Sequence, residues 1–416
     1  MAEDYLQQLF AERIGGPQFG FKEEIYKFEK IKRAKREAIQ ANPYMKLIDL
    51  GVGEPDAMAD EKIVQILTEE ANKPENRYYA DNGIAEFKQA AVSYMDRVFG
   101  VKNLDARTEI NHVIGSKSAL AILPSIFINH GDLTLIPSPC YPIIATHTKY
   151  YGGNVIDLPL TEENSFLPKL DALDESILRK AKLLYLNYPN NPTGATATAE
   201  FFEEVVHFAK KNKLIVVHDA AYAALVFDKE QPLSFLSVPG AKDVGVELHS
   251  LSKSFNMTGW RIGFIAGNSR LIEAFAAVKD NYDSGQFIAI QKAAAFALSQ
   301  PDMTEQIAAK YSRRHEQLVK VLNEVGFLAN KPNASFFLYT KAPRAVVNGP
   351  SFLSAEAFSQ YLIKEHLIST VPWDDVGQYV RFSVTFQANS VEKEMQVMEE
   401  IRSRLRKDQF VFERGE

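Results

Sequence analysis

Ser250-Leu251-Ser252-Lys253-Ser254-Phe255 and, shortly after it, Gly259-Trp260-Arg261-Ile262-Gly263 form the most informative stretch of this 416-residue chain. A lysine with neighbouring hydroxyls and an arginine suits an aldehyde that bears a phosphate, because the amine of Lys253 can form a Schiff base with the aldehyde. Ser250, Ser252 and Arg261 would hold the phosphate, Arg261 through its planar guanidinium. The stretch therefore predicts pyridoxal phosphate as the cofactor, although lysine and serine are also common in surface turns.

Two other segments place polar residues directly after an apolar run: Lys213-Leu-Ile-Val-Val-His-Asp219-Ala-Ala-Tyr222 and Leu183-Leu-Tyr-Leu-Asn-Tyr-Pro-Asn190-Asn191-Pro192-Thr193-Gly194. Both runs indicate buried strands. Ligands of open α/β sheets bind at the carboxyl ends of strands, so we expect Asp219, Tyr222 and Asn191 to meet the cofactor. Asp219 would keep the pyridine nitrogen protonated, and Tyr222 would donate to the phenolic oxygen of the ring.

These segments, in this order, resemble the fold-type I, pyridoxal-phosphate-dependent aminotransferases of class I/II. The resemblance extends from Leu50-Gly-Val-Gly53-Glu-Pro-Asp56 to Arg381-Phe-Ser-Val-Thr-Phe386. It implies an α/β fold with a mostly parallel sheet sandwiched by helices and a smaller α/β domain. It also implies that the protein is an enzyme, a transaminase that transfers an amino group from an amino acid to a 2-oxo acid.

The resemblance assigns roles to individual residues. Lys253 would be the Schiff-base lysine and general base, Asp219 would bind the pyridine nitrogen, and Asn191 and Tyr222 the phenolic oxygen. Arg381 would bind the substrate α-carboxylate, although an arginine at a strand end also suits a structural ion pair. Tyr141, in Pro139-Cys140-Tyr141-Pro142, would stack on the ring.

Val113-Ile-Gly115-Ser116-Lys117-Ser118 indicates a strand end, a tight turn and the start of a helix. The amino terminus of a helix offers free N–H groups to a phosphate. We therefore expect Ser116 both to cap the helix and to bind the phosphate. Tyr78 or Tyr79 resembles the tyrosine of the family that reaches the phosphate from the neighbouring subunit, which implies a homodimer.

Composition restricts the class of protein further. The chain has 47 basic and 53 acidic residues, a net charge of −6. This balance does not indicate a protein that binds nucleic acid or an anionic membrane. Cys140 is the only cysteine, so no internal disulfide can form and a reducing compartment is expected. With no apolar run of membrane-spanning length and no secretory signal pattern, we expect a cytoplasmic protein that binds no metal.

The pattern of elements predicts the domains. Strand-like and helical segments alternate from about residue 49 to 300, which indicates a large cofactor-binding domain. Residues 301–416 have a different pattern, with a long charged helix near residue 310, and are expected to form the small domain. By the resemblance, the amino-terminal arm, residues 1–48, joins that small domain.

Three stretches resemble the LL-diaminopimelate aminotransferases: Ile25–Ile31, Gly115–Lys117 and Lys279–Gln291. By that resemblance Tyr26, Gly53 and Lys117 would line the substrate or cofactor pocket, and the reaction would pair LL-2,6-diaminopimelate with 2-oxoglutarate. Plant-type members carry an asparagine near Phe287 that this chain lacks. An aminotransferase for aspartate, alanine or aromatic amino acids is therefore the alternative, and a tyrosine on an amphipathic helix also suits simple packing.

A different class of protein uses aminotransferase-like domains as non-catalytic, pyridoxal-phosphate-binding sensors fused to a DNA-binding module. That interpretation needs a basic helix-turn-helix segment ahead of the domain. About 48 residues precede Leu50-Gly-Val-Gly53, the length of the family's own arm, so we favour the enzyme.

Overall fold

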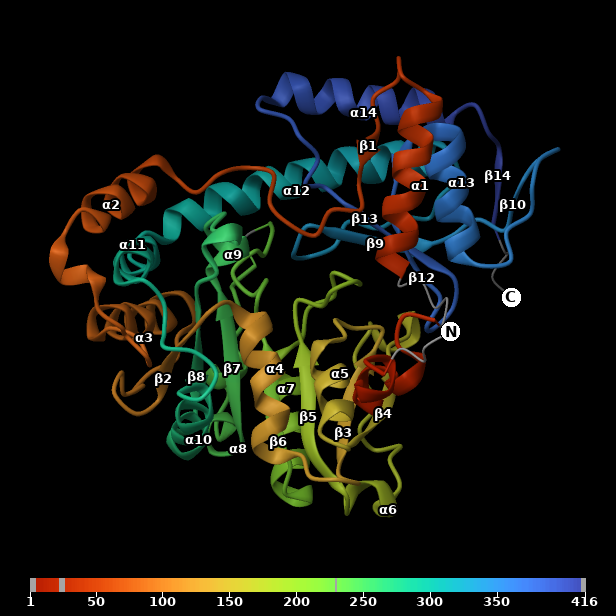
Figure 1. Cartoon of the computed structure of the whole chain (residues 1–416). Helices are drawn as coiled ribbons and strands as arrows, with labels where there is room; N and C mark the ends of the chain where they lie inside the picture. The colour runs from red at the N-terminus through yellow and green to blue at the C-terminus, as the bar shows by residue number, and fades with distance from the viewer. Residues whose placement is uncertain (1–4, 22–26, 229, 413–416) are drawn as a thin grey trace.

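The structure is a computed structural model that describes residues 5–21, 27–228 and 230–412. Figure 1 shows a large sheet with helices on both faces and a second unit, which contains α12 and α14, above one end of that sheet. The two units meet at this end, so both contribute residues there.

Within the described residues, the large sheet has seven strands. In spatial order they are β2 (Ile110–Val113), β8 (Gly263–Gly267), β7 (Gly245–Ser250), β6 (Ile215–Asp219), β5 (Ala181–Asn187), β3 (Leu133–Ser138) and β4 (Asn154–Pro159). The strands from β4 to β7 are parallel to their neighbours, whereas β8 is antiparallel to both β7 and β2. The prediction of a mostly parallel sheet is confirmed.

Both faces of this sheet are covered, which is why β6 begins with an apolar, β-branched run, Ile215-Val216-Val217. In β6, Val217 packs with side chains of α4 and α10, whereas Val216 packs with side chains of α7. The helices over the sheet are α4 (Ser116–Phe127), α5 (Ile143–Tyr150) and α10 (Ser269–Lys279) on one side, and α3 (Ala85–Phe99), α7 (Ala199–Asn212) and α11 (Ile288–Leu298) on the other. The predicted helix–sheet–helix layering is therefore present.

The second unit is built on a three-stranded antiparallel sheet in the order β12-β13-β9. Ile48 of β1 pairs with Ile368 of β11, so a strand near the amino-terminal end of the chain joins the carboxyl-terminal part. The elements of this unit are α1 (Lys27–Ala41), β1 (Ile48–Asp49), α12 (Pro301–Glu324), β9 (Phe337–Lys341), β10 (Ala345–Val346), α13 (Ala355–His366), β11 (Ile368–Ser369), β12 (Val371–Trp373), β13 (Tyr379–Ser383), α14 (Val391–Leu405) and β14 (Phe410–Val411).

Shorter elements connect these parts. They are α2 (Glu61–Ala71), which packs on α11, α6 (Glu175–Leu178), α8 (Ala241–Val244), α9 (Leu251–Ser254) and the 3-10 helices Gln7–Leu9, Glu12–Ile14, Gly16–Gln18, Pro74–Arg77, Glu162–Asn164, Phe235–Ser237 and Thr258–Trp260. Across the ranges that the structure describes, no helix has both the length and the apolar character that crossing a bilayer requires.

Candidate active site

Three parallel strands, β5, β6 and β7, end side by side and bring polar groups to one edge of the large sheet. Asn187, the last residue of β5, pairs with Asp219, the last residue of β6. The Asn187 side-chain amide donates a hydrogen bond to Asp219 O (2.8 Å). Ser250 ends β7 and caps α9, where its hydroxyl accepts from Ser252 N. The structure therefore brings together strand ends that are far apart in the sequence.

Lys253 lies in α9, directly after β7, and its amine points to the backbone of the 51–53 segment. Lys253 Nζ donates to Gly53 O (2.9 Å). Burial lowers the pKa of this amine to about 8, with Arg261 and Arg381 acting in the same direction and Glu54 against it. An amine with this pKa is partly neutral near physiological pH, as a base or nucleophile requires.

Arg261 lies beside the start of α4, and the two form a cationic cradle. Arg261 Nη1 donates to Ser252 Oγ (3.4 Å) and to Thr258 O (2.8 Å). Gly115 (φ 75°) precedes α4, and a Cβ at this position would lie 2.3 Å from Arg261 Nη2. Glycine is favoured there by its positive φ, and the absence of a Cβ leaves room for the Arg261 guanidinium. The free N–H groups of the 12-residue helix α4 thus begin beside a guanidinium.

The predicted capping role of Ser116 is wrong. Gly115 is the N-cap of α4, with no side-chain cap, and Ser116 is the first helical residue. The positive φ of Gly115 turns the chain into the helix one residue earlier than the pattern indicated. Ser116 directly follows Gly115, which lies beside Arg261. Its predicted contact with a phosphate therefore does not depend on the capping role.

Asp219 is buried, at 4% exposed, and both of its side-chain partners are neutral. Its Oδ1 accepts from Ala221 N (3.2 Å) and its Oδ2 accepts from the Tyr185 hydroxyl (3.3 Å). Burial raises the pKa of the Asp219 carboxyl to about 6, and the neighbouring His218 acts against the shift. A carboxyl group in this situation is stabilised by a cationic partner such as a protonated pyridine nitrogen.

Arg381 enters the site from β13 in the second unit. Its Nη1 donates to Asn191 Oδ1 (2.8 Å) and its Nη2 donates to Gly51 O (3.1 Å). The guanidinium lies 4.0 Å from the centroid of the Phe337 ring. Its buried Nε has no acceptor among the described residues, and burial lowers the guanidinium pKa to about 10. A carboxylate would supply the negative charge that this buried cation lacks.

Tyr222 lies close to Arg381, and Tyr141 lies close to Tyr222. The ring of Tyr222 packs edge-on against Phe336 and Phe337, with centroids 5.4 and 5.5 Å apart. Burial raises the pKa of the Tyr222 phenol, and Arg381 acts against the shift. Tyr141, partly buried just before α5, interacts electrostatically with Tyr222.

Three predicted residues are not drawn into this cluster. Tyr78 and Tyr79 are 58% and 85% exposed, and Tyr78 lies under the guanidinium of its neighbour Arg77. Lys117 is exposed on the first turn of α4. Tyr26, the other predicted substrate residue, falls outside the described residues.

Sequence reasoning missed Tyr185, Asn187 and Phe337. Tyr185 and Asn187 alternate along β5, and Asn187 also fixes the next turn, because its Oδ1 accepts from Asn191 N (2.9 Å). Their alternation in the strand that ends at Asn187 was a usable signal. Phe337, under the Arg381 guanidinium, had no such signal, because it is far from Arg381 in sequence and β9 is adjacent to β13 only in the sheet.

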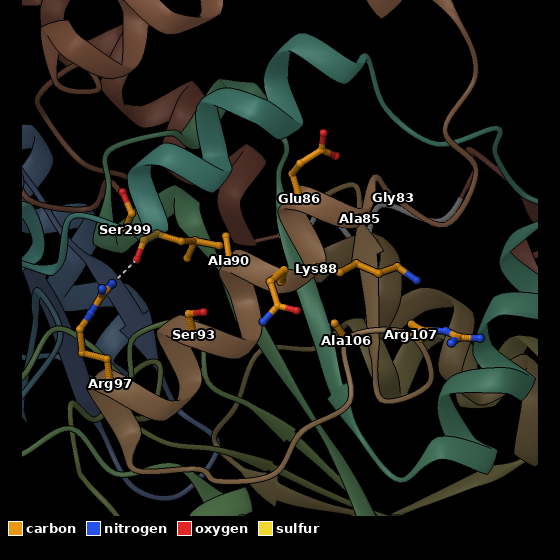
Figure 2. A pocket seen from close by; sticks show the side chains of 12 residues that line it. Gly83, Ala85, Glu86, Lys88, Ala90, Ser93, Arg97, Ala106, Arg107 and Ser299 are labelled. Carbon is orange, nitrogen blue, oxygen red and sulfur yellow. Dashed lines mark hydrogen bonds between the residues drawn. The ribbon is translucent and has the colours of Figure 1, made fainter.

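A cavity of about 750 Å³ beside α3 lies apart from these residues. Figure 2 shows its lining, which includes Lys88, Arg107 and Arg97, whose guanidinium donates to Leu298 O (2.6 Å). None of the predicted site residues lines it. Cavity size alone therefore does not locate the candidate site.

The residues present suit pyridoxal phosphate. The Gly115–Arg261 cradle, which a Cβ would fill, is cationic and suits the phosphate. The buried Asp219, whose hydrogen-bond partners among the described residues are neutral, suits the ring nitrogen, and the Lys253 amine with its lowered pKa suits the aldehyde.

Comparison with known proteins identifies the family. The sequence model of "Aminotransferase class I and II" matches residues 45–399. This chain belongs to the class I and II aminotransferases, and it is an enzyme whose cofactor is pyridoxal phosphate.

Individual proteins agree with this assignment. The chain is 58% identical to the LL-diaminopimelate aminotransferase of Methanocaldococcus jannaschii, over 99% of this chain and 100% of the relative. It is 41% identical to LL-diaminopimelate aminotransferase 2 of Trichormus variabilis, over 90% of this chain and 95% of the relative. Its structure matches substrate-bound BacF from Bacillus subtilis with a TM-score of 0.87 and 30% identity, over 98% of this chain and 100% of the other.

Proposed function

We propose that this enzyme transfers the amino group of LL-2,6-diaminopimelate to 2-oxoglutarate, with tetrahydrodipicolinate as the cyclised product, a reaction of lysine and peptidoglycan precursor biosynthesis. The observation that carries the proposal is a pair of hydrogen bonds, from Lys253 to Gly53 O and from Arg381 to Gly51 O. There, an amine with a pKa of about 8 and a buried guanidinium bind the same short backbone segment. The names of the curated relatives support the choice of donor.

The side chains divide the work of the reaction. Pyridoxal phosphate, when bound, supplies an aldehyde for the substrate amine and a ring that accepts electron density. Arg261, Ser250, Ser252 and Ser116 hold its phosphate. Lys253 Nζ carries the α-proton away from the substrate carbon as a general base.

Other side chains position the reactants. Asp219 holds the proton on the pyridine nitrogen, and Tyr222 and Asn191 contact the phenolic oxygen. Arg381 binds the α-carboxylate through its planar fork and so fixes which bond at the α-carbon is broken. Tyr141 stacks on the ring, and Gly53, whose carbonyl accepts from the Lys253 amine, lines the pocket.

A panel of amino donors tests the substrate. The measured quantity is kcat/KM for each donor, with 2-oxoglutarate as the acceptor in every assay. The donors are LL- and meso-diaminopimelate, aspartate, alanine and phenylalanine. A site that binds a second charged end rejects donors without that end by orders of magnitude, because its polar groups are then left unpaired. Equal or better efficiency with aspartate, alanine or phenylalanine contradicts the proposed donor and favours the alternative enzymes.

We also propose that the active unit is a homodimer, with Tyr78 or Tyr79 of one chain binding the phosphate in the other. The exposure of both phenols, at 58% and 85%, supports this, because neither is engaged within its own chain's core. Inactive Lys253→Ala chains mixed with inactive chains that carry Tyr78→Phe and Tyr79→Phe should regain part of the activity. Sedimentation that finds an active monomer at the assay concentration contradicts the dimer.

We further propose a cytoplasmic location, which the single cysteine, Cys140, supports, since the chain cannot form an internal disulfide. Fractionation of cells should recover the transaminase activity with cytoplasmic markers. Recovery with secreted or membrane fractions contradicts this location.

A further inference from the structure

Residues 50–56, which lie in the chain between β1 and α2, contact both the lysine and the arginine of the proposed site through their backbone. Gly53 O accepts from Lys253 Nζ (2.9 Å), and Gly51 O accepts from Arg381 Nη2 (3.1 Å). The carbonyls between and beside them are also held, Leu50 O by Ser383 N (2.7 Å) and Val52 O by Thr385 Oγ1 (3.2 Å). Residues 50–56 therefore link the amine and the guanidinium through one short backbone segment.

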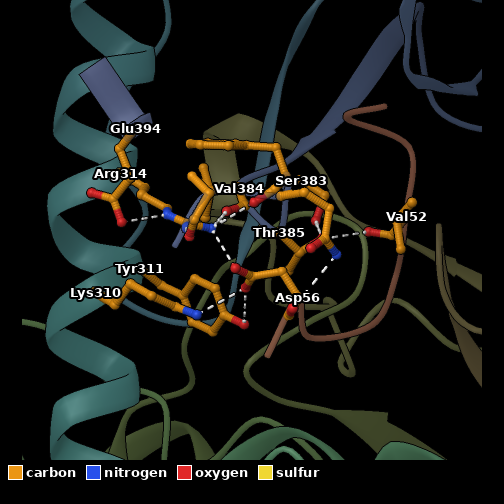
Figure 3. Close-up of polar contacts among 12 residues, drawn as sticks. Val52, Asp56, Lys310, Tyr311, Arg314, Ser383, Val384, Thr385 and Glu394 are labelled. Carbon is orange, nitrogen blue, oxygen red and sulfur yellow. Dashed lines mark hydrogen bonds and ion pairs between the residues drawn. The ribbon is translucent and has the colours of Figure 1, made fainter. Parts of the chain in front are cut away.

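Asp56, at the end of this segment, is anchored to α12 by three partners, as Figure 3 shows. Its Oδ1 accepts from Lys310 Nζ (2.8 Å) and from the Tyr311 hydroxyl (3.2 Å), and its Oδ2 lies 3.1 Å from Arg314 Nη1. The Asp56 side chain is 4% exposed and that of Arg314 is fully buried. Ion pairs this well buried are rigid, because breaking them leaves an uncompensated charge in the interior.

Arg314 is also held independently of Asp56. It donates to Val384 O (2.9 Å) and Phe386 O (3.0 Å), and its Nε donates to Glu394 (2.9 Å). The loss of the Asp56 carboxylate would leave Arg314 in place and detach the Asp56 end of the 50–56 segment from α12. The consequence of such a change is thus expected at Gly51 and Gly53.

We propose that Asp56 is a positioning residue, which fixes the 50–56 segment on α12 so that Gly53 O and Gly51 O hold the Lys253 amine and the Arg381 guanidinium in reacting geometry. The proposal rests on the proposed function for the roles of those two side chains. Asp56 itself contacts neither of them, and its effect passes through the backbone of residues 51–55.

The test compares Asp56→Asn with Arg313→Gln in the full-length holoenzyme. Asparagine keeps the size of Asp56 but removes the charge that faces Lys310 and Arg314. Arg313 neighbours Arg314 on α12 and pairs with Glu394 (2.9 Å), so Arg313→Gln removes a nearby ion pair without touching residues 50–56. Four quantities are measured: kcat, KM, the pH midpoint of the cofactor's visible absorbance, and the exchange rates of backbone amides in the cofactor-free protein.

We expect Asp56→Asn to lower kcat/KM by about tenfold to a hundredfold, the loss that follows a small misplacement of reacting groups. The absorbance midpoint should shift, and the amides of residues 51–53 should exchange faster. Arg313→Gln should lower the melting temperature and leave the other quantities unchanged. If Asp56→Asn also changes only the melting temperature, Asp56 is merely structural and the proposal is overturned.

Tyr311→Phe provides a milder version if Asp56→Asn does not fold. It removes one hydrogen bond to Asp56 and should change the same quantities in the same direction by a smaller factor. Amide exchange in the cofactor-free protein needs no donor, so it tests the positioning role even if another amino acid proves to be the substrate. Unchanged exchange at residues 51–53 in Tyr311→Phe, together with an unchanged absorbance midpoint, overturns the proposal.

Discussion

The cofactor side and the carboxylate side of the site are assembled in different ways. On the cofactor side, Asp219 ends β6 and Lys253 follows the adjacent parallel strand β7, and the ladder between those strands fixes their spacing. On the carboxylate side, Arg381 bonds to Asn191 and Gly51, which are 190 and 330 residues away in sequence. The first arrangement belongs to one sheet, whereas the second exists only when the two units are docked. Changes in docking should therefore affect carboxylate binding before they affect the cofactor.

The largest effect is expected on the cofactor side, at Lys253. Lys253→Ala should lower transamination by more than the ~10²–10⁴ typical of a general base, because the covalent role is lost as well. Lys253→Arg keeps the charge and should lose as much. Borohydride should fix the cofactor on Lys253 in the wild-type enzyme, as peptide mapping can show. Near wild-type turnover by Lys253→Ala contradicts the whole assignment of the site.

Asp219 tests whether the cofactor side was built for function rather than for stability. Asp219→Asn should lower kcat by roughly 10²–10³, since losing one partner of a buried charge pair costs about 3–4 kcal/mol. In the cofactor-free protein the same change should stabilise the fold. The pKa of Asp219 is raised from 3.8 to about 6, so the ionised carboxylate destabilises the fold above that pH.

The sign of this stability effect gives a pH test. The gain from Asp219→Asn should be absent near pH 3, appear as the pH rises through 4 to 6, and reach about 3 kcal/mol above that, from roughly 1.4 kcal/mol per pKa unit. Denaturant unfolding of both cofactor-free proteins at several pH values measures it. A gain that does not depend on pH would mean that Asp219 has another role in the cofactor-free fold.

The same contrast explains what the sequence could predict. Lys253, Asp219 and Asn191 follow strands, and the strand pattern together with the rule that ligands bind at strand carboxyl ends placed them at one edge. Ser116 was given the wrong capping role because the positive φ of Gly115 is a backbone property that the residue pattern does not report. Phe337 and the Asp56–Arg314 pair depend on long-range docking, which local patterns do not encode.

Arg381 tests the carboxylate side. Arg381→Lys should raise KM for both the amino donor and the oxo acid, and lower kcat/KM by about tenfold to a hundredfold, because lysine forms only one of the two parallel charged hydrogen bonds. Cofactor affinity should remain close to that of the wild type. Arg404→Lys is the matched control: Arg404 is also a buried arginine with backbone acceptors, His366 O and Leu367 O, but it lies in α14. If both variants change KM equally, Arg381 has no special part in carboxylate binding.

The smallest effect is expected at Tyr185, whose hydroxyl donates to Asp219 Oδ2 (3.3 Å). Tyr185→Phe removes one neutral hydrogen bond, worth about 1 kcal/mol, so kcat/KM should fall only several-fold. The loss of a donor to the carboxylate should also raise the pKa of Asp219 further. The fall in stability of the cofactor-free protein with rising pH should then extend to higher pH. Tyr188→Phe is the control, because that buried phenol lies close by in sequence but donates to Phe166 O (2.7 Å) rather than to Asp219. Equal pH profiles for the two variants would show that the Tyr185 hydroxyl does not tune Asp219, and that the cofactor side depends on its strand ends alone.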